Sequence, residues 1–203
     1  MKQYLIFSLF FSLSFINCKN NGEQQRPANY YKVEAVGTTG INMVIEIPAG
    51  TNHKIEYDPN TDSFINDVAD GKDRVISFLP YPGNYGFIPS TLMDKSRGGD
   101  GDALDILVIG ESEKIGTVLA VQPIGALLLL DNGEIDTKLI AIPSEPAKQV
   151  ISPKSFQDFI IQHDAARMII ENWFLNYKGQ GKMELIGWRD DTFALREIEK
   201  WKK

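Results

Sequence analysis

Short apolar runs between turn residues dominate the chain from about residue 30 to residue 142. Residues 41–47 mostly alternate between apolar and polar positions and are followed by Pro48, as at the end of a strand. Such closely spaced short strands predict a small β-barrel. Further runs rich in branched apolar residues, also typical of strands, are 74–79, 104–109, 118–121, 124–130 and 138–142.

The spacing of apolar residues changes to a helical period in the C-terminal part. Ser152 and Pro153 are typical of a helix start, since proline fits the first turn. Apolar side chains then recur at every fourth position up to Gly179, a typical helix end, and a second helix is expected to begin at Asp190 or Asp191. Strands followed by helices packed outside them predict the α+β class. The helical rows are Ala165, Ile169, Trp173 and Tyr177, with Ile170 and Phe174 beside them.

The first seventeen residues have the pattern of a secretory signal peptide rather than of a folded domain. Lys2 is the only charged residue before Lys19, and residues 4–16 form a nearly unbroken apolar run. A run of this length is too short for a membrane-spanning helix and fits the apolar region of a signal peptide. Residues 18–29 are polar, which predicts a flexible tether in front of one domain at residues 30–203.

Cys18 is the only cysteine in the chain and stands shortly after the apolar run. A cysteine at this place resembles the lipobox of bacterial lipoproteins, in which the thiol carries lipid and becomes the mature N-terminus. Phe15 and Asn17 depart from the leucine and the small residue of that motif. The alternatives are a cleaved signal with an incidental cysteine and an uncleaved anchor. We favour an exported, membrane-anchored lipoprotein, and a cytoplasmic protein if the segment is not a functional signal.

Composition narrows the chemistry that the domain can perform. The 203 residues include 27 acidic and 21 basic ones, and the net charge of −6 argues against a protein that coats nucleic acid. One cysteine provides neither an intramolecular disulfide nor a zinc site of several thiolates. His53 and His163 are the only histidines, so a metal must be held by carboxylates, which favours Mg²⁺, Mn²⁺ or Ca²⁺.

The densest acidic segment carries Asp100, Asp102 and Asp105 next to several glycines. Carboxylates this close repel one another unless a cation neutralises them. The simpler alternative is an acidic surface turn. An EF-hand is excluded, because Leu104 and Asp105 occupy loop positions that require a ligand and a glycine, even though Glu111 stands where the last ligand belongs.

Two further groups of charged residues adjoin predicted strands. The Asn-Gly pair at 132–133 predicts a hairpin turn. Asp136 and Lys138 follow it two residues apart, so both side chains can face one side of a strand. Lys54 and Glu56 have the same spacing and, taken alone, indicate an exposed strand. Carboxylates that hold metal ions, together with lysine, arginine and tyrosine side chains, provide what phosphoryl transfer to water requires.

Taken together, these segments resemble the soluble family I inorganic pyrophosphatases. The family signature Asp-x-Asp-[Pro/Glu]-aliphatic-Asp-aliphatic is matched from Asp100 to Ile106, with Ala103 in place of proline or glutamate. The other matching blocks follow in family order: Glu46-Ile47-Pro48-Ala49, Lys54-Ile55-Glu56, residues 81–86, residues 131–138, and Tyr177-Lys178 with Gly181-Lys182.

The resemblance implies an OB-like five-stranded β-barrel with C-terminal helices packed outside it. It also implies an inorganic diphosphatase, a hydrolase that converts diphosphate to two phosphates with several Mg²⁺ ions per active site, or with Mn²⁺. Asn132 stands where the family has an acid. The spacing from the basic phosphate-binding residue to Tyr81 is one residue shorter than in bacterial relatives. We choose Arg74 over Lys72 as that residue.

The resemblance also implies a role for each matching residue. Asp102 would be the general base. Asp100, Asp105 and Asp136 would bind the activating metals, and Asp131 would join them for metals that arrive with the substrate. Glu46 and Glu56 would orient metal-bound water. The phosphate-binding side chains would be Lys54, Arg74, Tyr85, Tyr177, Lys178 and Lys138, with Tyr81 beside them.

Two other functions stay open at this point. One is an exported OB-type module that binds polyanions without catalysis, and the other is a related hydrolase of polyphosphate or nucleoside triphosphates. All four aspartates at the base and activating-metal positions are present, whereas a decayed enzyme would have lost some of them. The expected partners are diphosphate, a membrane through the N-terminal lipid alone, and further copies of this chain, since bacterial members are often hexamers. Nucleic acid is not expected.

Overall fold

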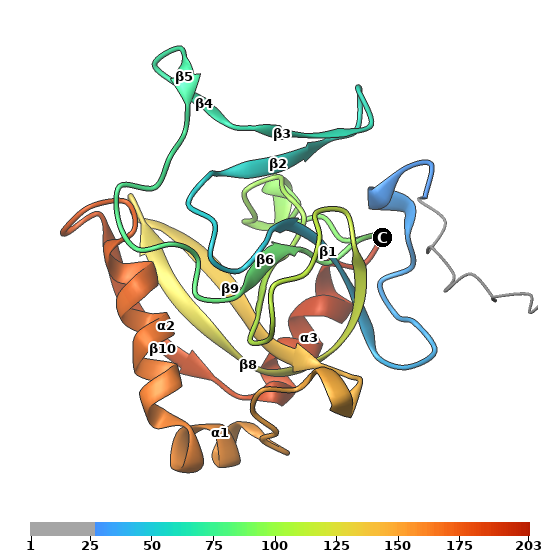
Figure 1. Cartoon of the computed structure of the whole chain (residues 1–203), viewed down its shortest axis with the longest axis vertical. Helices are drawn as coiled ribbons and strands as arrows, with labels where there is room; N and C mark the ends of the chain where they lie inside the picture. Colours follow the sequence, from blue (N-terminus) through green and yellow to red (C-terminus); the bar gives the residue numbers. More distant parts are fainter. Residues whose placement is uncertain (1–26) are drawn as a thin grey trace, which may run out of the picture.

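The computed structural model describes residues 27–203, so the predicted signal peptide, Cys18 and most of the tether lie outside the described residues. The central strands are β1 (Ile41–Ile47), β6 (Asn84–Phe87), β7 (Asp105–Val108), β8 (Val118–Asp131) and β9 (Glu134–Pro143). They pair in the order β1-β6-β7-β9-β8, and a further pairing of β8 with β1 closes the ring. The predicted α+β class and five-stranded barrel are therefore confirmed (Figure 1).

Strand β8 corrects one detail of the sequence prediction. Two strands were expected, at 118–121 and 124–130, but the chain forms one strand of 14 residues. Its pairing with β9 shifts register between Pro123 and Gly125, which is a β-bulge. Proline has no N–H to donate, so it is tolerated at such an irregularity within a continuous strand. The Asn132-Gly133 hairpin turn is confirmed by the pairing of Asp131 with Glu134.

Two small hairpins project from the barrel (Figure 1). One pairs β2 (Ile55–Asp58) with β3 (Ser63–Asn66), and the other pairs β4 (Val68–Ala69) with β5 (Lys72–Asp73). The N–H of Arg74 donates to the carbonyl of Asp67 at 2.7 Å and closes the base of the second hairpin.

The predicted strand at 74–79 is wrong. Only Val75 forms an isolated bridge, to His53. The N–H of Ile76 donates to the carbonyl of Asn52 at 2.7 Å, and that of Tyr81 donates to Thr51 at 2.9 Å. These backbone groups therefore pair with the loop before β2 instead of with a long neighbouring strand. The segment at 81–86, whose pattern alone suggests an aromatic turn, continues into β6.

Three α-helices follow in the described part: α1 (Phe156–Gln162), α2 (Asp164–Asn176) and α3 (Asp191–Trp201). The predicted single helix from residue 152 to residue 179 is interrupted at His163, and its first helical residue is Phe156. Ile169 of the first predicted row is 61% exposed, whereas Trp173 and Tyr177 of that row are buried together with Ile170 and Phe174, so the buried face combines both rows. The predicted start of the last helix is confirmed, because Asp190 caps α3.

Alternate side chains of the barrel strands enter two different parts of the core, as the two-residue period of a strand requires. Ile106 and Leu139 belong to a cluster shared with α3, whereas Leu107 and Ile140 belong to a cluster shared with α1 and α2. Strand β10 (Met183–Arg189) extends the sheet beside β8. Short 3₁₀ turns are η1 (Tyr30–Lys32), η2 (Lys95–Arg97) and η3 (Pro146–Lys148). No helix within residues 27–203 is long and apolar enough to cross a membrane.

Candidate active site

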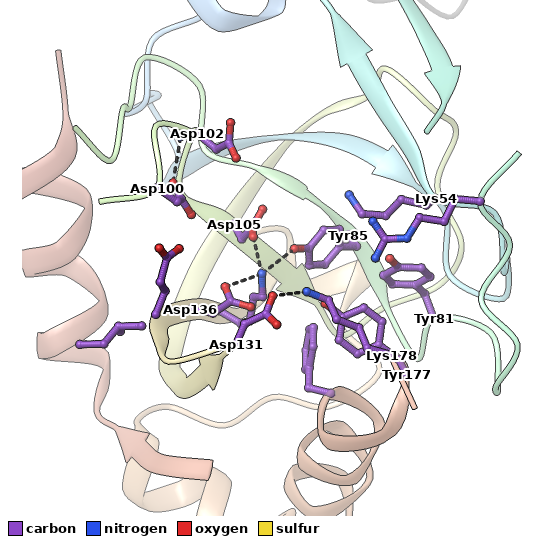
Figure 2. Close-up of a pocket in the computed structure, with 15 residues that line it drawn as sticks. Lys54, Tyr81, Tyr85, Asp100, Asp102, Asp105, Asp131, Asp136, Tyr177 and Lys178 are labelled. Carbon is purple, nitrogen blue, oxygen red and sulfur yellow. Dashed lines mark hydrogen bonds and ion pairs between the residues drawn. The ribbon is translucent and has the colours of Figure 1, made fainter. Parts of the chain in front are cut away.

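All the residues to which the sequence assigned a role in the domain line one of two adjoining hollows. The larger one, of about 260 Å³, is the main cavity, and the smaller one, of about 150 Å³, is the side pocket. Lys54, Tyr85, Asp102 and Asp105 line both hollows. Figure 2 shows the main cavity. The main cavity adds Arg74, Tyr81, Asp100, Asp131, Asp136, Lys138, Tyr177 and Lys178, and the side pocket adds Glu46 and Glu56.

A tight loop brings Asp100, Asp102 and Asp105 to the cavity. A carboxylate oxygen of Asp100 accepts a hydrogen bond from the N–H of Asp102 at 2.9 Å. The carbonyl of Asp102 in turn accepts one from Met93 at 2.7 Å. Gly101 has a φ of 96°, a conformation that favours glycine. Asp105 then begins strand β7, so the loop directs three carboxylates toward one hollow.

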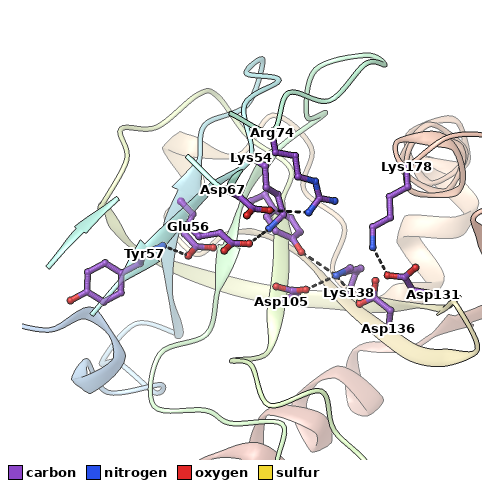
Figure 3. Close-up of polar contacts among 12 residues, drawn as sticks. Lys54, Glu56, Tyr57, Asp67, Arg74, Asp105, Asp131, Asp136, Lys138 and Lys178 are labelled. Atoms are coloured by element: carbon purple, nitrogen blue, oxygen red, sulfur yellow. Dashed lines mark hydrogen bonds and ion pairs between the residues drawn. The ribbon is translucent and has the colours of Figure 1, made fainter. Parts of the chain in front are cut away.

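The ammonium group of Lys138 lies at the centre of the polar contacts in the main cavity (Figure 3). It forms ion pairs with Asp105 and, at 2.7 Å, with Asp136, and it donates to the hydroxyl of Tyr85 at 3.1 Å. Burial by itself lowers the pKa of Lys138, but these carboxylates raise that pKa well above its ordinary value. Burial also raises the pKa of Asp136, against the opposing effect of Lys138. Lys138 therefore stays positively charged among carboxylates.

The C-terminal end of α2 carries Tyr177 and Lys178 to the same cavity. Lys178 forms an ion pair with Asp131 of the β8–β9 hairpin. The ring of Tyr177 stacks on Trp173 with centroids 4.8 Å apart, and Tyr81 contacts Trp173 at 4.4 Å. Trp173 is only 3% exposed, so both tyrosines are held against a fixed aromatic surface.

Arg74 and Lys54 enter the cavity from the chain segments that flank the two hairpins. The N–H of Lys54 donates to the carbonyl of Arg74 at 2.9 Å, which places the two residues side by side. The guanidinium of Arg74 contacts Asp67 at 3.0 Å, and the ammonium of Lys54 contacts Glu56. Lys72 is exposed on β5 and does not line the cavity, whereas Arg74 does.

The side pocket contains a carboxyl group that is almost fully buried. Glu46 is 8% exposed, and its carboxylate accepts a hydrogen bond from the N–H of Tyr57 at 2.8 Å. Burial raises the pKa of Glu46 to about 8, with Tyr57 and Lys54 acting in the opposite direction. Partial burial, and then the nearby charge of Asp100, raise the pKa of Asp102. Protons are therefore held more tightly here than by exposed carboxyl groups.

Sequence reasoning missed some residues that line these hollows. Glu134 lines the main cavity from the same hairpin as Asp131, so the acidic composition of that hairpin was a usable signal. Tyr31 and Phe87 line the side pocket, and neither stands next to a charged motif. Their place in the site depends on contacts between segments far apart in the chain.

The donor chemistry of the main cavity fits a magnesium-like cation. Asp100, Asp102, Asp105, Asp131 and Asp136 provide carboxylate oxygens, the ligands that Mg²⁺ prefers. Within residues 27–203, no three acidic or histidine side chains lie close enough to hold a metal ion as they stand. Three of these carboxylates are engaged with ammonium groups of the protein: Asp105 and Asp136 pair with Lys138, and Asp131 pairs with Lys178.

The chain is similar in sequence to known proteins. A family model described as inorganic pyrophosphatase matches residues 43–203. The inorganic pyrophosphatase of Synechocystis sp. is 36% identical over 163 residues, which cover 78% of this chain and 88% of the relative. That of Thermus thermophilus is 35% identical over 165 residues, covering 78% and 86%.

Solved structures show the same relationship in three dimensions. The crystal structure of the inorganic pyrophosphatase from Thermus thermophilus matches with a TM-score of 0.68 and 30% identity, over 84% of this chain and 95% of the other. The type I inorganic pyrophosphatase from Toxoplasma gondii matches with a TM-score of 0.74 and 27% identity, over 84% of this chain and 83% of the other.

Proposed function

Because the chain belongs to the inorganic pyrophosphatase family and is an inorganic diphosphatase, we propose that it hydrolyses diphosphate to two phosphates at the main cavity with the help of Mg²⁺. The observation that carries the proposal is that five aspartates and the cations of Lys54, Arg74, Lys138 and Lys178 line one hollow. Carboxylates attract the metal ions, and the cations attract the phosphate groups. The cavity therefore offers oppositely charged groups to both the metal ions and the diphosphate.

Metal ions are needed for a simple electrostatic reason. Diphosphate is strongly anionic, and five aspartates in one cavity repel it. Bound Mg²⁺ supplies positive charge beside the phosphates and lowers the pKa of water, which makes a nucleophile available near neutral pH. Asp100, Asp105 and Asp136 are the residues that we assign to the activating ions, and Asp131 to ions that arrive with the substrate.

Side chains of the protein accept the proton of the attacking water and neutralise the charge on the phosphates. Asp102 accepts the proton of the water that attacks one phosphorus, and its raised pKa suits a base that must take up this proton. The bond from that phosphorus to the bridging oxygen breaks, and the second phosphate leaves. Arg74, Lys54 and Lys178 neutralise the negative charge on the phosphate oxygens, and Tyr177 and Tyr85 offer hydroxyl groups near them.

Glu46 and Glu56 have a supporting role in this proposal. Both line the side pocket next to Asp102, and they would orient water molecules bound to the metal ions. Glu56 is engaged with Lys54, and Glu46 is fixed by the N–H of Tyr57, so their carboxylates have defined directions. Tyr81 lies beside the phosphate-binding residues and is held in place by its contact with Trp173.

The N-terminal segment supports a second part of the proposal, which concerns location. An apolar run followed by the only cysteine favours export, lipid attachment at Cys18 and anchoring to a membrane. Residues 18–29 would then form the tether of the domain. A functional copy outside the cytoplasm would remove diphosphate that is released there. Assembly into a homo-oligomer stays a prediction.

Substrate preference is the direct test of the proposed activity. Phosphate release is measured from diphosphate, tripolyphosphate and ATP at equal concentrations, each with Mg²⁺ and with EDTA. We expect diphosphate to be hydrolysed at least about a hundredfold faster than the other two, because the hollow of about 260 Å³ is small and polar. Faster hydrolysis of tripolyphosphate or ATP would overturn the assignment of diphosphate as the substrate.

A further inference from the structure

Tyr31 is a side-pocket residue that lies outside the region matched by the family model, which begins at residue 43. It belongs to η1, the short turn that precedes the barrel. In the side pocket it faces Glu46, Glu56 and Asp102, three of the carboxyl groups to which we assign roles. The N-terminal segment therefore contributes a side chain to the active site.

The backbone of Tyr31 is held firmly in this position. Its carbonyl accepts hydrogen bonds from the N–H of Ser90 at 3.1 Å and from the Ser90 hydroxyl at 3.3 Å. Its own N–H donates to the side chain of Asn29 at 2.9 Å. The ring contacts Phe87 and Tyr57 at centroid distances of 4.7 Å and 5.3 Å. None of these contacts uses the hydroxyl group, so the ring stays in place without it.

The segment from Ser90 to Met93, which holds Tyr31, also holds the backbone of Asp102. Ser90 holds Tyr31, and Met93, three residues later, donates its N–H to the carbonyl of Asp102 at 2.7 Å. Ala103, next to Asp102, packs in the same apolar cluster as Tyr31. Ala103 is also the residue at which this chain departs from the family signature. Tyr31 and Asp102 are therefore held relative to each other by one short segment and one shared cluster.

The charges around the side pocket determine whether the Tyr31 hydroxyl group is protonated and can donate a hydrogen bond. The walls carry Glu46, Glu56, Asp102 and Asp105, against the single ammonium group of Lys54. The ammonium group of Lys54 is engaged with Glu56, and the hydroxyl of Tyr85 accepts from Lys138. Burial, together with nearby Glu46 and Asp102, raises the pKa of Tyr31, so its hydroxyl stays protonated and is available as a donor.

We propose that Tyr31 is a positioning residue of this enzyme, whose hydroxyl group donates a hydrogen bond to the Asp102 carboxylate across the side pocket and holds that carboxylate toward the main cavity. A base must be oriented before it can take a proton from the attacking water. This inference rests on the role proposed for Asp102. The segment that joins the predicted tether to the barrel thereby takes part in the reaction.

The test replaces Tyr31 by phenylalanine in the otherwise complete protein. Tyr31→Phe keeps the ring contacts and loses only the hydroxyl group. We expect kcat for diphosphate to fall about tenfold, as is typical when a supporting hydrogen bond is removed, with KM changed less than about twofold. Tm should stay unchanged. Tyr30→Phe is the matched control: Tyr30 lies in the same turn and is buried beside Gly116, outside both hollows, so kcat should stay at the wild-type value.

A double-mutant cycle separates positioning from a general structural effect. If Tyr31 acts through Asp102, adding Tyr31→Phe to Asp102→Asn should cause no further loss of the residual kcat. An unchanged kcat in Tyr31→Phe, or equal losses in the wild-type and Asp102→Asn backgrounds, would overturn the inference. Full turnover by Asp102→Asn alone would instead overturn the proposed base, so the two failures are distinguishable.

Discussion

The ammonium nitrogen of Lys138 lies 2.7 Å from a carboxylate oxygen of Asp136, inside the main cavity. The same nitrogen pairs with Asp105. One ammonium group of the protein itself thus offsets part of the negative charge of two carboxylates that we assign to metal binding. A buried ion pair of this kind holds its geometry because an unpaired charge would be costly. A metal ion that binds Asp105 and Asp136 must compete with Lys138 for them.

Mg²⁺ should therefore stabilise the folded protein in a concentration-dependent way. A ligand that binds only the folded state raises Tm as its concentration rises. Lys138→Met should lower the Tm of the metal-free protein, because Asp105 and Asp136 lose their internal cation, and Mg²⁺ should then raise Tm by more than in the wild type. Thermal unfolding in EDTA and in graded Mg²⁺ measures both effects. Equal wild-type Tm values with and without Mg²⁺ would contradict the binding of Mg²⁺ to the folded protein.

Arg74 and Lys72 provide a matched pair for the phosphate side of the site. Both cations belong to the same projecting segment, but only Arg74 lines the main cavity. Arg74→Gln should raise KM for diphosphate and lower kcat/KM by about tenfold to a hundredfold, because one charged hydrogen bond to phosphate is lost. Lys72→Gln should leave both constants at wild-type values. The reverse pattern in steady-state kinetics would show that the cation was assigned wrongly.

The buried Glu46 should make the stability of the metal-free protein depend on pH. Its pKa is raised from 4.5 to about 8 in the folded state. Below about pH 4.5 both states hold the proton. As the pH rises toward 8, the unfolded chain releases the proton before the folded chain does, so the folded state loses stability.

Glu46→Gln removes this titration and can keep the hydrogen bond from Tyr57. The variant should match the wild type near pH 4.5 and become more stable than the wild type by on the order of a few kcal/mol at pH 8. Chemical denaturation in EDTA at a series of pH values measures the difference, and all other titrating groups are common to both proteins. A difference that is the same at every pH would argue against a buried, protonated Glu46.

Cys18 should determine where the protein is found. If its thiol carries lipid, the mature protein begins at Cys18 and fractionates with membranes. Cys18→Ser should release the protein or leave the unprocessed precursor. Activity of the domain from about residue 27 onward should be unaffected, because Tyr31 is the first residue with a proposed role. Mass spectrometry of the native protein identifies the N-terminus, and an unmodified N-terminus elsewhere would refute lipid attachment.

Much of the fold could be predicted because its signals are local. The alternation in β1, the long apolar runs of β8 and β9 and the Asp190 cap of α3 all stand in short stretches of sequence. Strand β10 was missed because most of its residues are exposed and its structure comes from pairing with β8. The interruption at His163 was missed because neither glycine nor proline marks it.

The site was predictable to the extent that its residues belong to spaced motifs. The aspartate loop and the Asp136–Lys138 pair have regular spacings, and the structure brings them into one cavity. The choice between Arg74 and Lys72 depended on the path of the β4–β5 hairpin, which the sequence pattern does not specify. Tyr31 depends on the docking of η1 against Ser90, a contact between segments 59 residues apart. Such long-range contacts leave no local pattern.

The role of Asp102 is tested most directly by comparing phosphate release from diphosphate by the wild type, Asp102→Asn and Asp105→Asn at a series of Mg²⁺ concentrations. The wild type should release two phosphates per diphosphate with Mg²⁺ and none in EDTA. Asp102→Asn should lose turnover by at least about a hundredfold while it still binds Mg²⁺ and diphosphate, because the shape remains and the proton acceptor is gone. Asp105→Asn should need more Mg²⁺ for half-maximal activity, since a ligand charge is lost. Near-full turnover by Asp102→Asn would contradict the account of the reaction.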